Sequence, residues 1–315
     1  MPKHVLLVDV DSVIPNLALK KCEIYHKAIG DYVETSEIFE SWADRIYVSS
    51  VFEWSKDKTT YWANNKRAIV GGTGWDYKVT LPHEIASIIP KINIGFTTRG
   101  CVRRCEFCFV PKMEGVIKPV AKVHDIWDGK SKELMLLDNN ILALPSHFRE
   151  VCHDIRKNKI KVDFNQGMDL RLLYANQSLL EELQTIRHPE YKFAWDLDDD
   201  TMGKKLEWLH DNLGRCTIYV YTDGVCISYD KCLWKLNELK RMGHNAHLML
   251  NICLRDDPVY KKLRSWVNAH AVFQAMSYEE YKASNGKIDS NKSEITRKSH
   301  SADNKVEVIE DNLLF

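Results

Sequence analysis

Residues 95–115 read GFTTRGCVRRCEFCFVPKMEG, and this stretch holds Cys101, Cys105 and Cys108 in the spacing C-x3-C-x2-C. It begins at the end of an apolar run, residues 92–97, which predicts a β-strand. Iron–sulfur clusters usually take four cysteines, so a loop that offers three thiolates leaves one iron without a protein ligand. Catalytic metal sites keep such a position open for a substrate. The spacing therefore predicts a 4Fe-4S cluster with one open iron.

Two other interpretations of the three cysteines stay open at this point. Structural zinc normally takes four ligands, and the nearest fourth candidates are His124 and Cys152. The thiols can also carry no metal, because cysteine is often simply buried. Either interpretation makes the chain a non-catalytic metal-binding or regulatory protein.

Apolar runs and helical stretches alternate on both sides of the motif. Between residues 89 and 281 they predict six strands that alternate with helices, which is a partial (β/α)6 barrel, short of the eight repeats of a closed one. The predicted strands are 92–97, 134–138, 160–164, 191–196, 217–222 and 246–252, and the predicted helices are 145–157, 177–186, 203–212, 230–241 and 258–268.

Residues 1–88 predict a separate, smaller α/β domain. Strands are expected at 4–10, 45–52 and 67–72, with a helix at 16–29. This order is typical of a small doubly wound, Rossmann-like fold. Residues 282–315 are rich in Ser, Asn and Lys and predict a flexible C-terminal tail.

Composition restricts the functional class and the location. The 315 residues contain 44 Lys plus Arg and 44 Asp plus Glu, so the net charge is zero. General nucleic-acid binders normally carry a basic excess, which does not favour nucleic acid as a partner. No apolar run approaches the roughly 20 residues of a membrane span, and we expect no membrane partner. Nine cysteines without an export signal favour reduced thiols and a cytoplasmic protein.

The cysteine motif resembles the signature of the radical S-adenosylmethionine (SAM) superfamily, C-x3-C-x-aromatic-C, with Phe107 as the aromatic residue. The resemblance spans roughly residues 91–270. It implies that the open iron chelates SAM, that the reduced cluster cleaves SAM to methionine and a 5′-deoxyadenosyl radical, and that this radical abstracts hydrogen from a substrate. It also implies that Phe107 packs near the adenine of SAM and that flavodoxin or ferredoxin supplies the electron. The sequence does not name the substrate.

The segment after the second barrel strand is the next candidate for SAM binding. In the superfamily it binds the SAM amino group, often through a glycine pair and a glutamate. Here the corresponding residues are Asp138, Asn139 and Asn140. The resemblance assigns the same role to them.

Three further candidates follow the third and fourth barrel strands, where the active sites of (β/α) barrels lie. Gln166 and Arg171 follow the third strand, and Asp196 follows the fourth. The forked donors of Arg171 suit the SAM carboxylate, although an ordinary ion pair with Asp169 is the alternative. Asp196 is expected to contact ribose or substrate, or to cap the next helix.

The first domain resembles the cobalamin-binding domains that precede many radical SAM cores. Their histidine motif is missing from DVDSVIPN (9–16), whereas Ser49–Phe52 and Gly71–Gly72 loosely match two later elements. A cobalamin-dependent methyltransferase is therefore an alternative, and a degenerate domain that aids substrate binding is favoured over bound cobalamin. Methylthiotransferases need three further N-terminal cysteines, and only Cys22 is present.

Basic residues surround the cysteine motif. They can receive a phosphate-bearing substrate such as a nucleotide, offset the charge of a thiolate-ligated cluster, or dock an acidic electron donor. The set is Arg99, Arg103, Arg104, Lys112, Lys118 and Lys122.

Overall fold

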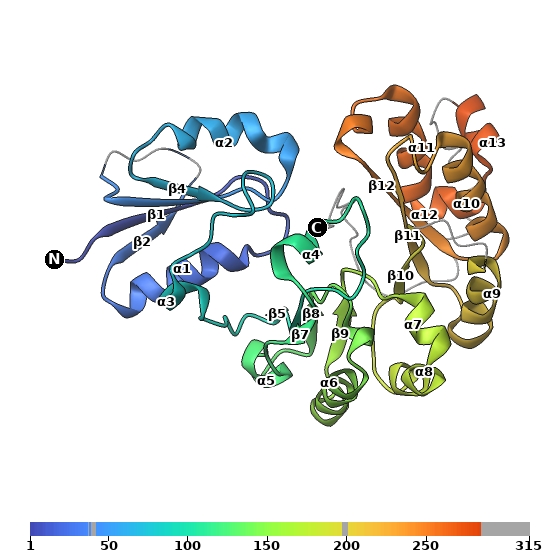
Figure 1. The fold of residues 1–315 in the computed structure, drawn as a ribbon, viewed down its shortest axis with the longest axis horizontal. Coiled ribbons are helices and arrows are strands. Elements are labelled where there is room, and N and C mark those ends of the chain that lie inside the picture. The colour runs from blue at the N-terminus through green and yellow to red at the C-terminus, as the bar shows by residue number, and fades with distance from the viewer. Residues whose placement is uncertain (37, 39–41, 197–200, 285–315) are drawn as a thin grey trace. The chain divides into compact units, whose positions relative to one another are not determined.

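The computed structural model describes residues 1–36, 38, 42–196 and 201–284 (Figure 1). Contacts divide the chain into two compact units. The first contains Met1–Gln166 and Ser178–Pro189, and the second contains Gly167–Gln177 and the described residues from Glu190 onward. The chain is a mixed α/β protein with parallel sheets, which confirms the fold class at this level.

The first unit begins with a four-stranded parallel sheet in the order β2-β1-β3-β4. Its strands are β1 (His4–Asp9), β2 (Tyr32–Thr35), β3 (Arg45–Ser49) and β4 (Ala68–Gly71). Its helices are α1 (Leu17–Ala28), α2 (Lys56–Ala63) and α3 (His83–Ala86), with a 3-10 turn at Glu53–Ser55.

The alternation of side chains along β1 explains why helices cover both faces of this sheet. Successive residues of a strand point to opposite faces, and all four central residues of β1 are apolar and buried. Val5 and Leu7 pack with Leu19 of α1, whereas the other face packs with Trp62 of α2. Figure 1 shows α1 and α2 on opposite sides of the sheet.

The first unit continues with a second parallel sheet in the order β5-β8-β9 and an antiparallel pair β6-β7. The strands are β5 (Ile94–Gly95), β6 (Thr98–Arg99), β7 (Lys118–Pro119), β8 (Glu133–Leu136) and β9 (Lys161–Phe164). The helices are α4 (Val110–Glu114), α5 (Val123–Ile126), α6 (Pro145–Asn158) and α8 (Gln177–Gln184), with a 3-10 turn at Ile141–Ala143.

The second unit is built on a parallel sheet in the order β10-β11-β12. The strands are β10 (Lys192–Ala194), β11 (Thr217–Thr222) and β12 (Asn245–Leu250). The helices are α7 (Leu170–Ala175), α9 (Met202–Leu213), α10 (Tyr229–Arg241), α11 (Pro258–Asn268), α12 (His270–Ala275) and α13 (Tyr278–Ala283), with a 3-10 turn at Ile252–Leu254.

Each of the six apolar runs predicted as barrel strands contains or overlaps a strand of these two three-stranded sheets. Strand β2 was not predicted, because it is an edge strand whose burial shows no apolar face. The N-terminal sheet belongs to the same compact unit as β5, β8 and β9, and the division into domains after residues 88 and 281 stays a prediction. From residue 285 on, the predicted tail lies outside the described residues.

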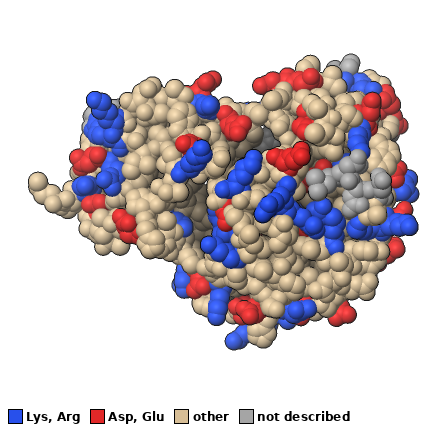
Figure 2. Space-filling model, in the orientation of Figure 1, with Lys and Arg blue, Asp and Glu red and all other residues tan. Residues whose placement is uncertain are grey.

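Within the described part of the chain, no helix is both long enough and apolar enough to cross a bilayer. Acidic and basic side chains are interspersed over the face drawn in Figure 2, in keeping with a net charge of zero.

Candidate functional site

The three motif cysteines lie on the loop between β6 and α4, and this loop is fastened at both ends. The backbone N–H of Cys101 donates to the carbonyl of Gly115 at 3.2 Å, and the N–H of Gly100 donates to Glu114 Oε2 at 2.7 Å. Gly100 has φ +89, and a Cβ atom there would lie 2.7 Å from the carbonyl oxygen of Gly115. Only glycine fits this close approach without strain, so it starts the loop.

Arg99 and Glu114 close the base of the same loop. Arg99 Nη2 lies 2.6 Å from Glu114 Oε1, and its guanidinium carbon lies 4.1 Å from the centre of the Phe96 ring. One member of the predicted basic stretch is thus neutralised inside the protein. Sequence reasoning missed Glu114, because no pattern marked it among the other surface acids.

The motif thiols differ from most other cysteines of the chain. Cys101, Cys105 and Cys108 are partly exposed and form no disulfide. By contrast Cys22, Cys152, Cys216 and Cys232 are buried, and burial raises the pKa of each of these thiols to about 12. A thiol with so high a pKa is a poor metal ligand, because the thiolate is the ligand form.

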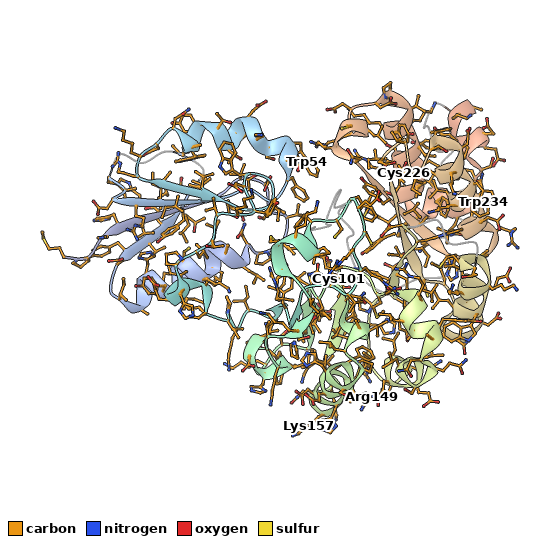
Figure 3. All side chains as sticks on the ribbon, viewed as in Figure 1. Trp54, Cys101, Arg149, Lys157, Cys226 and Trp234 are labelled. Atoms are coloured by element: carbon orange, nitrogen blue, oxygen red, sulfur yellow. The ribbon has the colours of Figure 1, made fainter. Side chains whose placement is uncertain are left out.

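Two N–H donors are directed at the sulfur of Cys101. The backbone N–H of Arg103 donates to Cys101 Sγ at 3.3 Å, and Asn140 Nδ2 donates to it at 3.7 Å. Such bonds stabilise a thiolate and tune the potential of an iron–sulfur cluster. Figure 3 marks Cys101 beside α4.

Among the described residues, no three His, Cys, Asp or Glu side chains are grouped around the position of a single metal ion. A 4Fe-4S cluster does not require such a group, because each thiolate binds a different iron. The donor set of three partly exposed thiols, with hydrogen bonds to the sulfur of Cys101, fits that cluster.

Asp138 holds the strand that leads into the cysteine loop. It follows β8, is 4% exposed, and accepts hydrogen bonds from the backbone N–H and the hydroxyl of both Thr97 and Thr98. Burial raises the pKa of its carboxyl. All four donors come from the protein, so Asp138 holds Thr97 and Thr98 in position. The sequence had predicted a contact between Asp138 and SAM instead.

Asn139 and Asn140 contact the cysteine loop and the helix that follows it. Asn139 Nδ2 donates to Glu114 Oε2 at 3.1 Å. Asn140 is 3% exposed, and its Oδ1 atom is buried with no hydrogen-bond partner among the described residues. A buried amide oxygen without a donor is costly to leave unpaired.

Phe107 lies in the cysteine loop and is half-buried. Gln166 follows β9 in the chain. It lines a cavity of about 200 Å³ together with Asn139, Arg99 and Glu114. The structure therefore groups Gln166 and Asn139 with the residues that fasten the cysteine loop.

Arg171 and Asp196 belong to the second unit. The guanidinium of Arg171 binds Asp169 in a forked arrangement, with Nε–Oδ1 at 2.8 Å and Nη2–Oδ2 at 3.1 Å. The ion pair considered as the alternative is thus present, and Asp169 also caps α7 through the N–H of Arg171.

Asp196 follows β10 and accepts from the backbone N–H of Tyr221 at 3.2 Å. Burial raises its pKa, whereas the nearby charge of Lys235 opposes that rise. Lys235 is a fully buried residue of α10, donates to the carbonyl of Trp195 at 3.1 Å, and has its pKa lowered by burial. Sequence reasoning missed Lys235, since a lysine in an amphipathic helix is normally exposed.

The glycine pair expected to match a cobalamin site packs against its own neighbours instead. A Cβ atom at Gly72 would lie 2.1 Å from the carbonyl oxygen of Ser50, and the Ser50 N–H donates to the carbonyl of Gly71 at 3.0 Å. Asp11 accepts from the N–H groups of Val51 and Phe52 at 2.7 and 3.0 Å. The two elements are therefore bonded to each other through their backbones and through Asp11.

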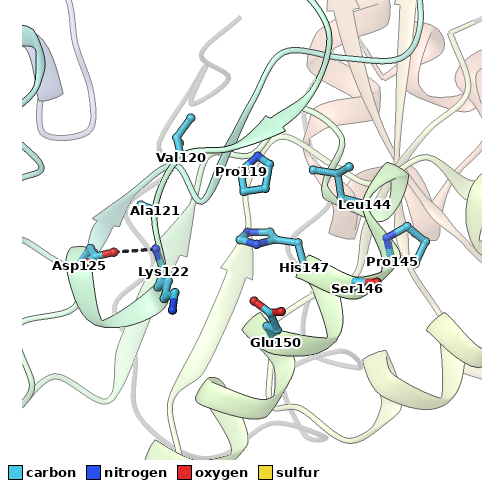
Figure 4. Close-up of a pocket in the computed structure, with 10 residues that line it drawn as sticks. All are labelled: Pro119, Val120, Ala121, Lys122, Asp125, Leu144, Pro145, Ser146, His147 and Glu150. Carbon is cyan, nitrogen blue, oxygen red and sulfur yellow. Dashed lines mark hydrogen bonds between the residues drawn. The ribbon is translucent and has the colours of Figure 1, made fainter.

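A larger groove lies elsewhere on the first unit. It has a volume of about 610 Å³ and runs between the segment after β7 and the start of α6 (Figure 4). The His147 ring lines it, and Lys122 closes one side through a bond from its N–H to Asp125 at 2.8 Å. None of the predicted site residues lines this groove.

Comparison with known proteins gives no match, either to a protein-family model or to a curated sequence. The cysteine motif and the geometry of the residues around it are therefore what indicates a function.

Proposed function

We propose that this protein is a radical SAM enzyme that holds a 4Fe-4S cluster through Cys101, Cys105 and Cys108. The observation that carries the proposal is the state of these thiols. They are partly exposed, unpaired in disulfides, and placed on a fastened loop with two N–H donors at Cys101 Sγ.

The three thiols, the two N–H donors and Phe107 have separate roles in the proposed site. The three thiolates bind three irons, and the N–H groups of Arg103 and Asn140 hold the Cys101 sulfur in place. When bound, a cluster with one open iron supplies the position at which SAM is chelated and reductively cleaved to methionine and a 5′-deoxyadenosyl radical. The buried Oδ1 of Asn140 accepts a hydrogen bond from the SAM ammonium group, and Phe107 packs near adenine.

Asp138 keeps this arrangement rigid without contacting SAM. Its four bonds to Thr97 and Thr98 tie the entrance of the loop to the end of β8. A preorganised loop loses less conformational entropy when it binds a ligand.

The fold supports the proposal at a coarser level. In parallel α/β sheets, ligands bind outside the carboxyl ends of the strands. The cysteine loop, Asp138 and Gln166 follow β5/β6, β8 and β9 in that order. Arg171 and Asp196 belong to the second unit, where Arg171 is paired with Asp169, and they are not assigned a part in the proposed site.

Cobalamin is not part of the proposal. The elements that would hold it, Ser49–Phe52 and Gly71–Gly72, are bonded to one another. We propose instead that the four-stranded domain aids substrate binding, and that flavodoxin or ferredoxin supplies the electron in the cytoplasm.

The test is reconstitution of the full chain with iron and sulfide without oxygen, followed by dithionite and SAM. We expect about four irons per chain, absorbance near about 400 nm, and release of 5′-deoxyadenosine. One zinc per chain with no sulfide, or SAM that stays intact, would contradict the proposal.

A further inference from the structure

The cavity of about 200 Å³ has walls from two parts of the first unit. Ser12, Asn16 and Ser49 line it from the carboxyl ends of the N-terminal strands and the start of α1, and Asn139 and Gln166 line it from the ends of β8 and β9. Drug-sized ligands usually occupy about 300–1,000 Å³, so this cavity fits a single small ring system.

The lining carries no net charge. Arg99 and Glu114 are its two charged residues, and they form an ion pair of 2.6 Å with each other. A phosphate or a carboxylate would find no uncommitted cation there, and burial of an unpaired anion is costly. The cavity therefore selects a neutral ligand.

The amide side chains of the two walls differ in the groups that they leave for a ligand. Asn16 is satisfied, because its Oδ1 accepts from Ala18 and Leu19, and its Nδ2 donates to Ser12 and Ser49 at 2.9 Å. On the opposite wall, in the part of the chain that the structure describes, neither the carboxamide of Gln166 nor Oδ1 of Asn139 has a protein partner. These groups offer a donor and two acceptors to a ligand.

Aromatic rings complete the lining. Phe96 is held by the Arg99 guanidinium stacked on it, and Phe109 stacks against Tyr77 with ring centres 6.4 Å apart. Flat rings bind well beside aromatic side chains, and a glutamine or asparagine carboxamide can pair with the donor–acceptor edge of a nucleobase.

We propose that this cavity binds a neutral, planar nitrogen heterocycle of the nucleobase class as the recognition element of the substrate, with Gln166 and Asn139 as its edge partners. The inference rests on the proposed function for the statement that this ligand is a substrate. The binding site itself depends only on the cavity.

The test is equilibrium binding to the full, reconstituted chain by calorimetry. The probes are adenosine, guanosine, cytidine and uridine, each with and without saturating SAM, and a short single-stranded oligonucleotide in a second arm. We expect at least one nucleoside to bind with an affinity that SAM leaves unchanged. Tighter binding of the oligonucleotide would assign the base to a nucleic acid, and equal or weaker binding would assign it to a free nucleoside.

Substitutions of lining residues test whether the nucleoside binds in this cavity. Gln166→Ala is expected to weaken nucleoside binding by about tenfold, the scale of one bidentate carboxamide–base contact. Ala18→Leu adds volume to the lining without removing a polar group and should also weaken binding. The control Gln184→Ala makes the same side-chain change at an exposed position of α8 in the same unit and should leave the affinity unchanged.

The proposal is overturned if no probe binds, if Gln166→Ala and Ala18→Leu keep the wild-type affinity, or if SAM displaces the nucleoside. Displacement would assign the cavity to the adenine of SAM. The same preparation is assayed for SAM cleavage, so the two proposals fail separately. Nucleoside binding without SAM cleavage keeps the site and removes the radical chemistry.

Discussion

The cysteines of the motif loop and the cysteines of the core differ in exposure, and the contrast between them is informative. The thiols of the cysteine loop are partly exposed and lie on a loop fastened by Gly100, Glu114 and Asp138. Those of the core, such as Cys22 and Cys232, are fully buried among apolar side chains or under helices. Residue type alone does not separate the groups. Their spacing in the sequence separates the two groups, because the three loop thiols are close enough in sequence to bind one cluster.

The contrast between loop and core cysteines predicts its largest effect on the iron content of cysteine variants. Cys105→Ala removes a proposed iron ligand, so we expect iron to fall from about four per chain to less than about one, with loss of SAM cleavage. Cys232→Ala removes a buried sulfur and should keep the iron while lowering the free energy of unfolding by about 1 kcal/mol. Iron and sulfide analysis with thermal unfolding measures both. Equal iron in the two variants would remove the distinction.

The second effect is on thiol reactivity in the metal-free protein. At pH 8 a thiol of ordinary pKa is partly ionised, whereas buried thiols whose pKa is raised to about 12 are ionised about 1,000-fold less. We expect Cys101, Cys105 and Cys108 to react with a disulfide reagent in the native state, together with the exposed Cys226 and Cys253. Peptide mapping after labelling identifies the sites. Rapid labelling of Cys22 or Cys232 in folded protein is the contrary result.

A third prediction concerns how the loop is held. Asp138→Asn replaces one of the two acceptor oxygens by an amide donor, so in either orientation of the amide at least one donor of Thr97 or Thr98 loses its acceptor. We expect a loss of about 1–3 kcal/mol in urea unfolding and weaker retention of iron. The control is Asp211→Asn on the exposed face of α9.

The pH dependence of the Asp138 effect follows from the sign of its pKa shift. Burial raises the pKa of the Asp138 carboxyl, so its contribution to stability is fully present below the unfolded pKa. That contribution is lost as pH rises toward the folded pKa. Asp138→Asn cannot ionise, and its stability should lack this dependence. An identical pH profile in the wild type and the variant would contradict the assignment.

The smallest effect is expected at the buried pair of the second unit. The charge of Lys235 lowers the pKa of Asp196, which burial raises, so Lys235→Met should raise that pKa further. Carboxyl NMR of aspartate-labelled protein follows the titration, and Lys204→Met on the exposed surface of α9 is the control. A fall in the Asp196 pKa would show that the two groups do not interact as described.

Sequence patterns predicted the strand positions well, because each buried strand is a short apolar run. The edge strand β2 lacks such a run, and the two-unit division depends on packing that no local pattern records. At the site, spacing identified the three cysteines. The bonds of Asp138 to Thr97 and Thr98, by contrast, join residues about 40 positions apart and could not be read from the sequence.

Arg171 illustrates a different limit of sequence reasoning. Both of its predicted roles, a ligand contact and an ion pair with Asp169, require the same forked donors. The structure shows the ion pair. Residue type and strand position are compatible with either, so only geometry distinguishes them.

The proposed 4Fe-4S cluster with one open iron is tested most directly by electron paramagnetic resonance. The spectrum of the reduced, reconstituted protein is recorded before and after addition of SAM. Three cysteine ligands leave one iron open, so we expect SAM to change the spectrum of the reduced 4Fe-4S cluster. A spectrum that SAM leaves unchanged, or a protein that binds zinc and gives no iron–sulfur signal, would contradict the account.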